Sequence, residues 1–249
     1  SKMFEDMGIT LQVVDASERF FSNLEGVTDP EEKRKVIGEQ FIRVFEEEQE
    51  KCGAKFLVQG TIAPDWIESG GGQRDVIKSH HNVGGLPDDV DLEIVEPLRE
   101  FYKDEVRQIA RELGIQSSER QPFPGPGLAV RVLGQLTRPR VEACREACHI
   151  VETRLREASE KGLCELPWQY FAALLPVRSV GVHGDTRVHG ETVVVRAVTS
   201  LDGMSARFSE IPHEVLASIS TEITNSLKGQ VNRVVYDITH KPPGTIEWE

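Results

Sequence analysis

No run of apolar residues in this sequence approaches the roughly 18 that a membrane-spanning helix needs. The first residues, Ser-Lys-Met-Phe-Glu-Asp, also lack the apolar segment of a secretion signal. Cysteine is scarce, with four in 249 residues, which argues against a disulfide framework and favours a reducing compartment. We therefore expect a cytoplasmic protein with no membrane partner.

Basic residues are also in deficit, and the net charge is −12. Residues 1–125 carry 26 acidic and 15 basic side chains, whereas residues 126–249 carry 15 and 14. The acidic first half argues against a nucleic-acid partner, because DNA and RNA are bound by basic faces. The nearly neutral second half could still hold a small anion with a few placed arginines and lysines.

Residues 1–121 alternate strand and helix patterns, which predicts an α/β fold with a parallel sheet. The apolar run Phe56-Leu57-Val58 is typical of a strand buried on both faces. The clearest helix has Asp29 as its N-cap and Gly53 as its C-terminal glycine. We expect strands over 9–14, 55–58 and 92–95, helices through 20–24, 30–52 and 103–113, and a buried face at Val36, Ile37, Phe41, Val44 and Phe45.

The segment from Gln121 to Gly127 holds three prolines and two glycines, so it can be neither a helix nor a central strand. We place a domain boundary here, between residues 1–121 and 122–249. The pattern beyond it segregates strands from helices, which predicts an α+β unit. The expected strands are 128–133, 171–182, 191–199 and 231–239, and the expected helices are 141–158 and 212–227.

Polar residues follow the predicted strand at 55–58. Gln59, Gly60 and Thr61 stand where α/β sheets bind ligands, and they suit an adenine or ribose edge, although a simple turn is the alternative. Asp65 and Glu68 lie three residues apart, so on a helical turn both carboxylates could hold Mg²⁺. A solvated helix start with acids at its positive end is the alternative for this pair.

The glycines at 69–72 lack the spacing of a P-loop and indicate a hinge. Beyond them Lys78, His80 and His81 lie in a glycine-flanked stretch that suggests a mobile lid carrying charge for a polyphosphate. A generic polar loop is the alternative. Adjacent histidines point in different directions, so a shared metal is poorly supported.

Cys144 and Cys148 lie four residues apart on the predicted helix, without accompanying metal-ligand spacing. Buried packing is favoured over metal or redox chemistry for both. The C-terminal stretch Lys-Pro-Pro-Gly-Thr-Ile-Glu-Trp-Glu, residues 241–249, is stiffened by two prolines, which indicates an ordered tail. Lys241 could neutralise a phosphate there, with backbone N–H groups assisting, although docking for stability alone is the alternative.

Together these strings resemble glutamine-hydrolysing GMP synthases, in order and over the whole chain. The resemblance rests on Val58–Thr61 with Asp65 and Glu68, on Ile77–Pro87, on Pro122–Leu128, on Leu175–Gly181 and on the tail at 241–249. It implies an ATP-pyrophosphatase domain of the adenine nucleotide alpha-hydrolase type over 1–121, present in part, and a C-terminal dimerisation domain that binds XMP over 122–249. The implied localisation is cytoplasmic and the implied assembly is a homodimer.

The resemblance also implies a reaction and its residues. ATP, with Mg²⁺, adenylates O2 of XMP and releases pyrophosphate, and ammonia from a separate or fused glutaminase then displaces AMP at C2 to give GMP. Gln59 and Gly60 would lie at the ATP site, Asp65 and Glu68 would support the metal or lid, and Lys78, His80 and His81 would form the lid. The implied XMP-binding residues are Arg131, Gln169, Lys241, Ile246 and Glu247.

The chain departs from the family pattern in two respects. The Ser-Gly-Gly-x-Asp-Ser loop that the family places before the first strand and the Cys-His-Glu glutaminase are not found in these residues. We therefore expect Ser1 to lie inside a longer protein, and the isolated chain to bind XMP weakly and dimerise with little ATP turnover. The alternative is a non-catalytic nucleotide-binding and dimerisation module; an asparagine or NAD synthetase fits the lid and tail poorly.

Overall fold

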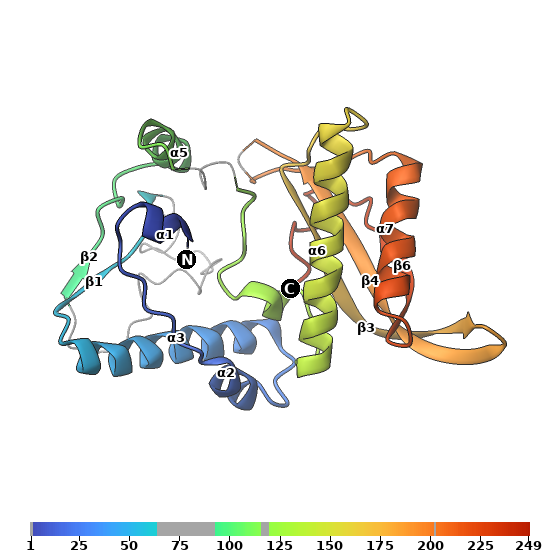
Figure 1. Ribbon diagram of the computed structural model, residues 1–249, viewed down its shortest axis with the longest axis horizontal. Helices are drawn as coiled ribbons and strands as arrows, with labels where there is room; N and C mark the ends of the chain where they lie inside the picture. Colours follow the sequence, from blue (N-terminus) through green and yellow to red (C-terminus); the bar gives the residue numbers. More distant parts are fainter. Residues whose placement is uncertain (1, 64–92, 116–119, 202) are drawn as a thin grey trace.

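The computed structural model describes residues 2–63, 93–115, 120–201 and 203–249. The chain forms a first part that contains a small parallel sheet and a second part in which helices pack on a larger, mainly antiparallel sheet (Figure 1). The C-terminal tail returns to the region between the two parts (Figure 1). The mixed α/β composition agrees with the sequence prediction.

The N-terminal region consists of helices and loops. The helices are α1 (Lys2–Asp6), α2 (Ser17–Asn23) and α3 (Pro30–Cys52). The predicted strand over 9–14 is wrong, because these residues have no regular structure. Ile9, Leu11 and Val13 are exposed, and without a neighbouring strand their alternating pattern has nothing to pair with.

Helix α3 begins and ends where the sequence predicts. The Asp29 carboxylate accepts a hydrogen bond of 2.9 Å from the Glu32 N–H, and Gly53 closes the helix with φ of 67°. The predicted buried face is only partly correct, since the buried residues are Lys33, Ile37 and Ile42. Phe41 stays half-exposed although its ring contacts Phe20 edge-to-face.

The first sheet pairs β1 (Phe56–Val58) with β2 (Glu93–Val95) in parallel, as the α/β pattern predicts. The expected burial on both faces is wrong, because Phe56 is 55% and Val58 67% exposed. The described residues supply only these two strands to the sheet. Helix α5 (Lys103–Glu112) follows β2.

The second part begins with a 3₁₀ turn, η2 (Gly127–Val130), where a strand over 128–133 was expected. That prediction is wrong: Gly127 has φ of 65°, which turns the chain away from an extended path, and only Val132 makes a bridge, to Leu174. The remaining elements are α6 (Arg138–Glu160), β3 (Gln169–His183), β4 (Thr186–Thr199), β5 (Arg207–Phe208), α7 (His213–Ser226) and β6 (Val231–Tyr236).

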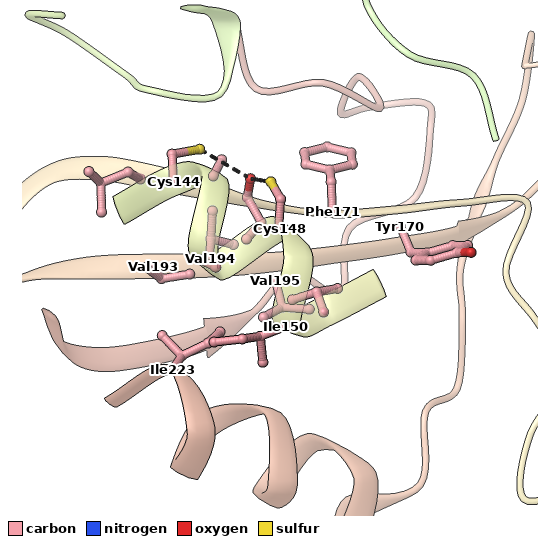
Figure 2. Close-up of a cluster of buried hydrophobic side chains, with 14 of the residues drawn as sticks. Cys144, Cys148, Ile150, Tyr170, Phe171, Val193, Val194, Val195 and Ile223 are labelled. Atoms are coloured by element: carbon pink, nitrogen blue, oxygen red, sulfur yellow. Dashed lines mark hydrogen bonds between the residues drawn. The ribbon is translucent and has the colours of Figure 1, made fainter. Parts of the chain in front are cut away.

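Strand β4 organises the second sheet. It pairs antiparallel with β3 and β5 and parallel with β6. Helices α6 and α7 cover this sheet, and the core between them is built from aliphatic side chains of β4, α6 and α7 (Figure 2). Cys144 and Cys148 are buried in this core, as predicted, and the Cys148 thiol lies 3.1 Å from the Ala172 carbonyl oxygen (Figure 2).

The core of the second part also includes residues from the first. Leu24, which follows α2, and Ile37 of α3 are both 5% exposed and belong to the same buried cluster as Val141 of α6. The segment between α2 and α3 therefore joins the two parts by apolar packing as well as through the chain.

Candidate functional site

The predicted nucleotide residues of the first part divide into two groups. Gln59 and Gly60 follow β1, at the carboxyl end of a parallel strand, where ligands bind in α/β sheets. The Gln59 N–H donates to the Val95 carbonyl at 2.9 Å, which extends the pairing by one residue. The other group, Asp65, Glu68, Lys78, His80 and His81, lies outside the described residues.

Three of the predicted XMP residues meet in the second part although they lie far apart in sequence. Arg131 follows η2, Gln169 opens β3 and Glu247 lies in the tail. Arg131 donates from Nε and Nη2 to the two carboxylate oxygens of Glu247, at 3.1 and 2.8 Å. Gln169 Nε2 donates to Glu247 Oε1 at 2.8 Å. Glu247 is thus held by three hydrogen bonds, two of them in the fork geometry typical of arginine and carboxylate.

Aromatic rings hold Arg131 as well. Its guanidinium carbon lies 4.1 Å from the centroid of the Phe171 ring and 4.9 Å from that of Phe123. The residue is completely buried. Burial opposes the charged form, but the hydrogen bonds and charge of Glu247 raise the pKa of Arg131 above its usual value.

One donor of the Arg131 guanidinium is not used within the site. Nη1 is buried and has no hydrogen-bond partner among the residues that the structure describes. A buried donor without an acceptor is costly, and such groups commonly face a ligand or water. This atom therefore fits the polar edge of a bound molecule.

The thiol of Cys148 lies beside this guanidinium and responds to it. A hydrogen bond with Cys144 and the positive charge of Arg131 hold the pKa of Cys148 below its usual value, against the effect of burial. Both thiols face main-chain carbonyls inside the core (Figure 2). Their buried position suits packing around Arg131 and not attack on a substrate.

Arg196, on β4, shapes the tail that carries Glu247. Its guanidinium donates to the carbonyl oxygens of Thr239 at 2.5 Å, Thr245 at 3.0 Å and Ile246 at 3.4 Å, and it forms an ion pair of 3.4 Å with Asp237. The residue is completely buried. Sequence reasoning missed it, although an arginine inside the apolar run Val-Val-Val-Arg-Ala-Val is a signal that a buried charge has partners.

Lys241 and Ile246 occupy different places in the tail. Lys241 Nζ donates to the Gly203 carbonyl at 2.8 Å, and its backbone pairs with Ala206. No hydrogen bond between described residues joins Lys241 to Arg131 or Glu247. Ile246 is 9% exposed and belongs to the core, with its carbonyl facing Arg196. The structure therefore brings together Arg131, Gln169 and Glu247 directly, and Ile246 through Arg196.

A second buried cation, Lys33 of α3, was not predicted from the sequence. Its ammonium group donates to Glu249 Oε2 at 2.5 Å, to the Val132 carbonyl at 2.9 Å and to the Ala129 carbonyl at 3.3 Å. Its spacing four residues before the buried Ile37 places it on the inward helix face, which is the signal in the sequence.

A cavity of about 450 Å³ adjoins this cluster. It lies between α2, α3, the Pro-Gly segment and α6, and its wall is mostly apolar. Phe123 lines it and also stacks on Arg131. Among the described residues no helix is long and apolar enough to cross a membrane, and no three histidine, cysteine or acidic residues are grouped as metal ligands.

The comparisons with known proteins agree in pointing to one family. A model for the GMP synthase C terminal domain matches residues 156–248. The chain is 55% identical over 248 residues to a protein of Thermoplasma acidophilum that is named as one of two GMP synthase (glutamine-hydrolyzing) subunits, covering 100% of this chain and 79% of the relative. It is 58% identical over 251 residues to the protein of the same name from Thermococcus kodakarensis, covering 100% and 78%.

A longer relative gives the same result. GMP synthase (glutamine-hydrolyzing) of Caldanaerobacter subterraneus is 57% identical over 239 residues, covering 95% of this chain but 46% of the relative. The chain therefore spans about four fifths of the two relatives named as subunits and less than half of the longer one.

Proposed function

The chain belongs to the GMP synthase family, a family of ATP-using ligases, and from this premise we propose that it supplies the XMP pocket and part of the ATP site of the synthetase reaction. The observation that carries the proposal is the convergence of Gln169, Glu247 and the buried Arg131, whose Nη1 has no partner among the described residues. A planar cation between two rings, next to a carboxylate and an amide, suits a planar ligand with oxygen and N–H edges.

The proposed reaction has two steps. O2 of XMP attacks the α-phosphorus of ATP, so that an oxygen–phosphorus bond forms and pyrophosphate leaves. Ammonia then attacks C2, the bond from C2 to the adenylated oxygen breaks, and AMP and a proton leave to give GMP. Neither step needs a protein nucleophile, so the residues act by positioning and by neutralising charge.

We assign the XMP contacts to Arg131, Gln169, Lys241, Glu247 and the backbone of Ile246. Arg131 and Gln169 would donate to oxygen atoms of XMP, and Glu247 would accept from an N–H edge. Lys241, whose ammonium faces the Gly203 carbonyl in this structure, would neutralise the phosphate. The carboxylate of Glu247 already receives three hydrogen bonds and is therefore oriented before the ligand arrives.

The ATP side of the proposal uses residues of 1–121. Gln59 and Gly60 lie where a parallel sheet binds nucleotides, which supports a role at the adenosine. Asp65 and Glu68 are proposed for Mg²⁺, which when bound neutralises the phosphates, and Lys78, His80 and His81 for a lid. These assignments rest on the family motifs in the sequence.

We further propose an assembly for this reaction. The relatives are named glutamine-hydrolyzing, and several are named as separate subunits, which supports a fused or separate glutaminase as the source of ammonia. The ATP-pyrophosphatase fold over 1–121, homodimerisation through 122–249 and a cytoplasmic location are proposals of the same kind.

The test is XMP binding and turnover. Titration calorimetry with XMP is expected to show binding that Arg131→Lys weakens about 10- to 100-fold, because lysine cannot reproduce the fork with Glu247. Arg187→Lys, at the exposed start of β4, is the control and leaves binding unchanged. GMP formation from XMP, ATP and ammonia is measured in the natural polypeptide that contains these residues. XMP affinity that Arg131→Lys leaves intact contradicts the assignment.

A further inference from the structure

Lys33 connects α3 to the site from the far side of the predicted domain boundary. Its side chain is completely buried, and its ammonium group has three acceptors: the carbonyl oxygens of Ala129 and Val132 and the carboxylate of Glu249. Two of these acceptors flank Arg131 in sequence, and the third lies two residues after Glu247. Lys33 therefore touches both chain segments that provide the Arg131–Glu247 pair.

Glu249 completes the connection. Its Oε1 accepts from the Gly134 N–H at 2.9 Å, while Oε2 accepts from Lys33. The Glu249 side chain is 8% exposed, so its pairing with Lys33 is shielded from water. The segment 129–134 is thus fixed at Ala129, Val132 and Gly134, and the tail is fixed to the same segment twice, through Glu247 and through Glu249.

A buried ammonium of this kind has one stable arrangement. Its charge is costly to bury, and burial lowers the pKa of Lys33, so the three acceptors must be in place for the folded state to hold it. Moving the tail or the 129–134 segment would leave the cation without partners. The arrangement consequently favours one position of Glu247 relative to Arg131.

We propose that Lys33 is a positioning residue for the XMP site, acting from α3 through Glu249 to fix the tail and the Arg131 segment. The proposal rests on the assignment of XMP to this pocket. It adds that part of the synthetase half holds the XMP-binding groups in register, although Lys33 itself touches none of the assigned XMP-binding side chains.

The first experiment measures steady-state kinetics of ammonia-dependent GMP formation in the natural polypeptide. Lys33→Met and Glu249→Gln are each expected to raise KM for XMP about tenfold and to leave KM for ATP within twofold. The double variant is expected to match the single variants, because both remove the same link. Lys35→Met, an exposed lysine on the same helix, leaves both constants unchanged.

The second experiment keeps the inference testable apart from XMP. Hydrogen exchange of the tail amides at 245–249, without ligand, is expected to accelerate about tenfold in Lys33→Met and in Glu249→Gln. If Lys33→Met does not fold, Glu249→Gln carries the test, because it keeps the size of the side chain and leaves α3 intact.

The outcomes separate the two proposals. Unchanged tail exchange in a folded variant, or a rise in KM for ATP equal to that for XMP, overturns the positioning role. Failure of the unmodified protein to bind XMP overturns the pocket assignment, while faster tail exchange in the variants still supports Lys33 as the residue that fixes the tail.

Discussion

The guanidinium carbon of Arg131 lies 4.1 Å from the centroid of the Phe171 ring, and both residues are completely buried. Phe171 comes from the buried start of β3, whereas Phe123 on the other ring contact is 60% exposed. The cation is therefore supported by a fixed ring on one side and a more accessible ring on the other. The two aromatic contacts differ in what their loss should cost.

Replacement of the two phenylalanines tests this difference. Phe171→Leu is expected to lower the free energy of unfolding by about 1–2 kcal/mol, since it removes a buried ring and its contact with the cation. Phe123→Leu is expected to cost less than about 0.5 kcal/mol, because much of that ring is in water. Urea unfolding followed by fluorescence measures both. Equal effects would contradict the asymmetric support of Arg131.

Arg196 should be among the most sensitive positions of the second part. Arg196→Met removes the donor to the carbonyls of Thr239, Thr245 and Ile246 and leaves Asp237 without its buried partner. The expected loss is about 3–5 kcal/mol in the free energy of unfolding. Arg207→Met, in the exposed part of β5, is the matched control and stays within about 0.5 kcal/mol. A loss below about 1 kcal/mol at Arg196 would mean that the tail is held by other contacts.

Two glycines should respond to alanine in opposite directions. A Cβ at Gly38 in α3 meets nothing within 4 Å, so Gly38→Ala is expected to stabilise the protein by about 0.4–1 kcal/mol. A Cβ at Gly190 in β4 would lie 3.0 Å from Asn232 Cγ and 3.1 Å from the Gln230 carbonyl oxygen, where β6 approaches. Gly190→Ala is expected to cost about 1–3 kcal/mol. Thermal unfolding distinguishes the two, and stabilisation at Gly190 would contradict the close approach.

The buried lysine predicts a pH dependence. Burial lowers the pKa of Lys33 below its usual value of 10.5, so the unfolded chain binds this proton more tightly than the folded one. The resulting penalty is fully present below the folded pKa and disappears as pH rises to 10.5. The free energy of unfolding should therefore rise relative to Lys33→Met across that window, with Lys35→Met as the control for net charge. A constant difference between the proteins would show that the pKa of Lys33 is unshifted.

The sequence predicted the long helices because their ends are chemically marked. Asp29 and Gly53 delimit α3, and the helix expected over 141–158 matches α6 apart from a few residues at each end. Strands β3 and β4 were predicted from their apolar runs, since both are covered by helices. The predictions for 9–14 and 128–133 failed because a strand pattern states a preference, while pairing depends on a partner elsewhere in the chain.

The site was predicted in a different way. Arg131, Gln169 and Glu247 came from the family motifs, since no local pattern joins residues up to 116 positions apart. Lys33 and Arg196 were missed because their partners are mostly main-chain carbonyls, which carry no sequence signature. Only their presence among apolar neighbours could have marked them, as charged residues that a buried face does not accept without compensation.

The sharing of Leu24 and Ile37 with the core of the second part has a consequence for cooperativity. The boundary placed at 121/122, which stays a prediction, marks a change of architecture along the chain, but the buried cluster does not end there. A fragment starting at residue 122 would expose the surface that α3 covers and would lose the cation that satisfies the Ala129 and Val132 carbonyls. The smallest piece that melts as one unit should therefore include the helices before the boundary as well as everything after it.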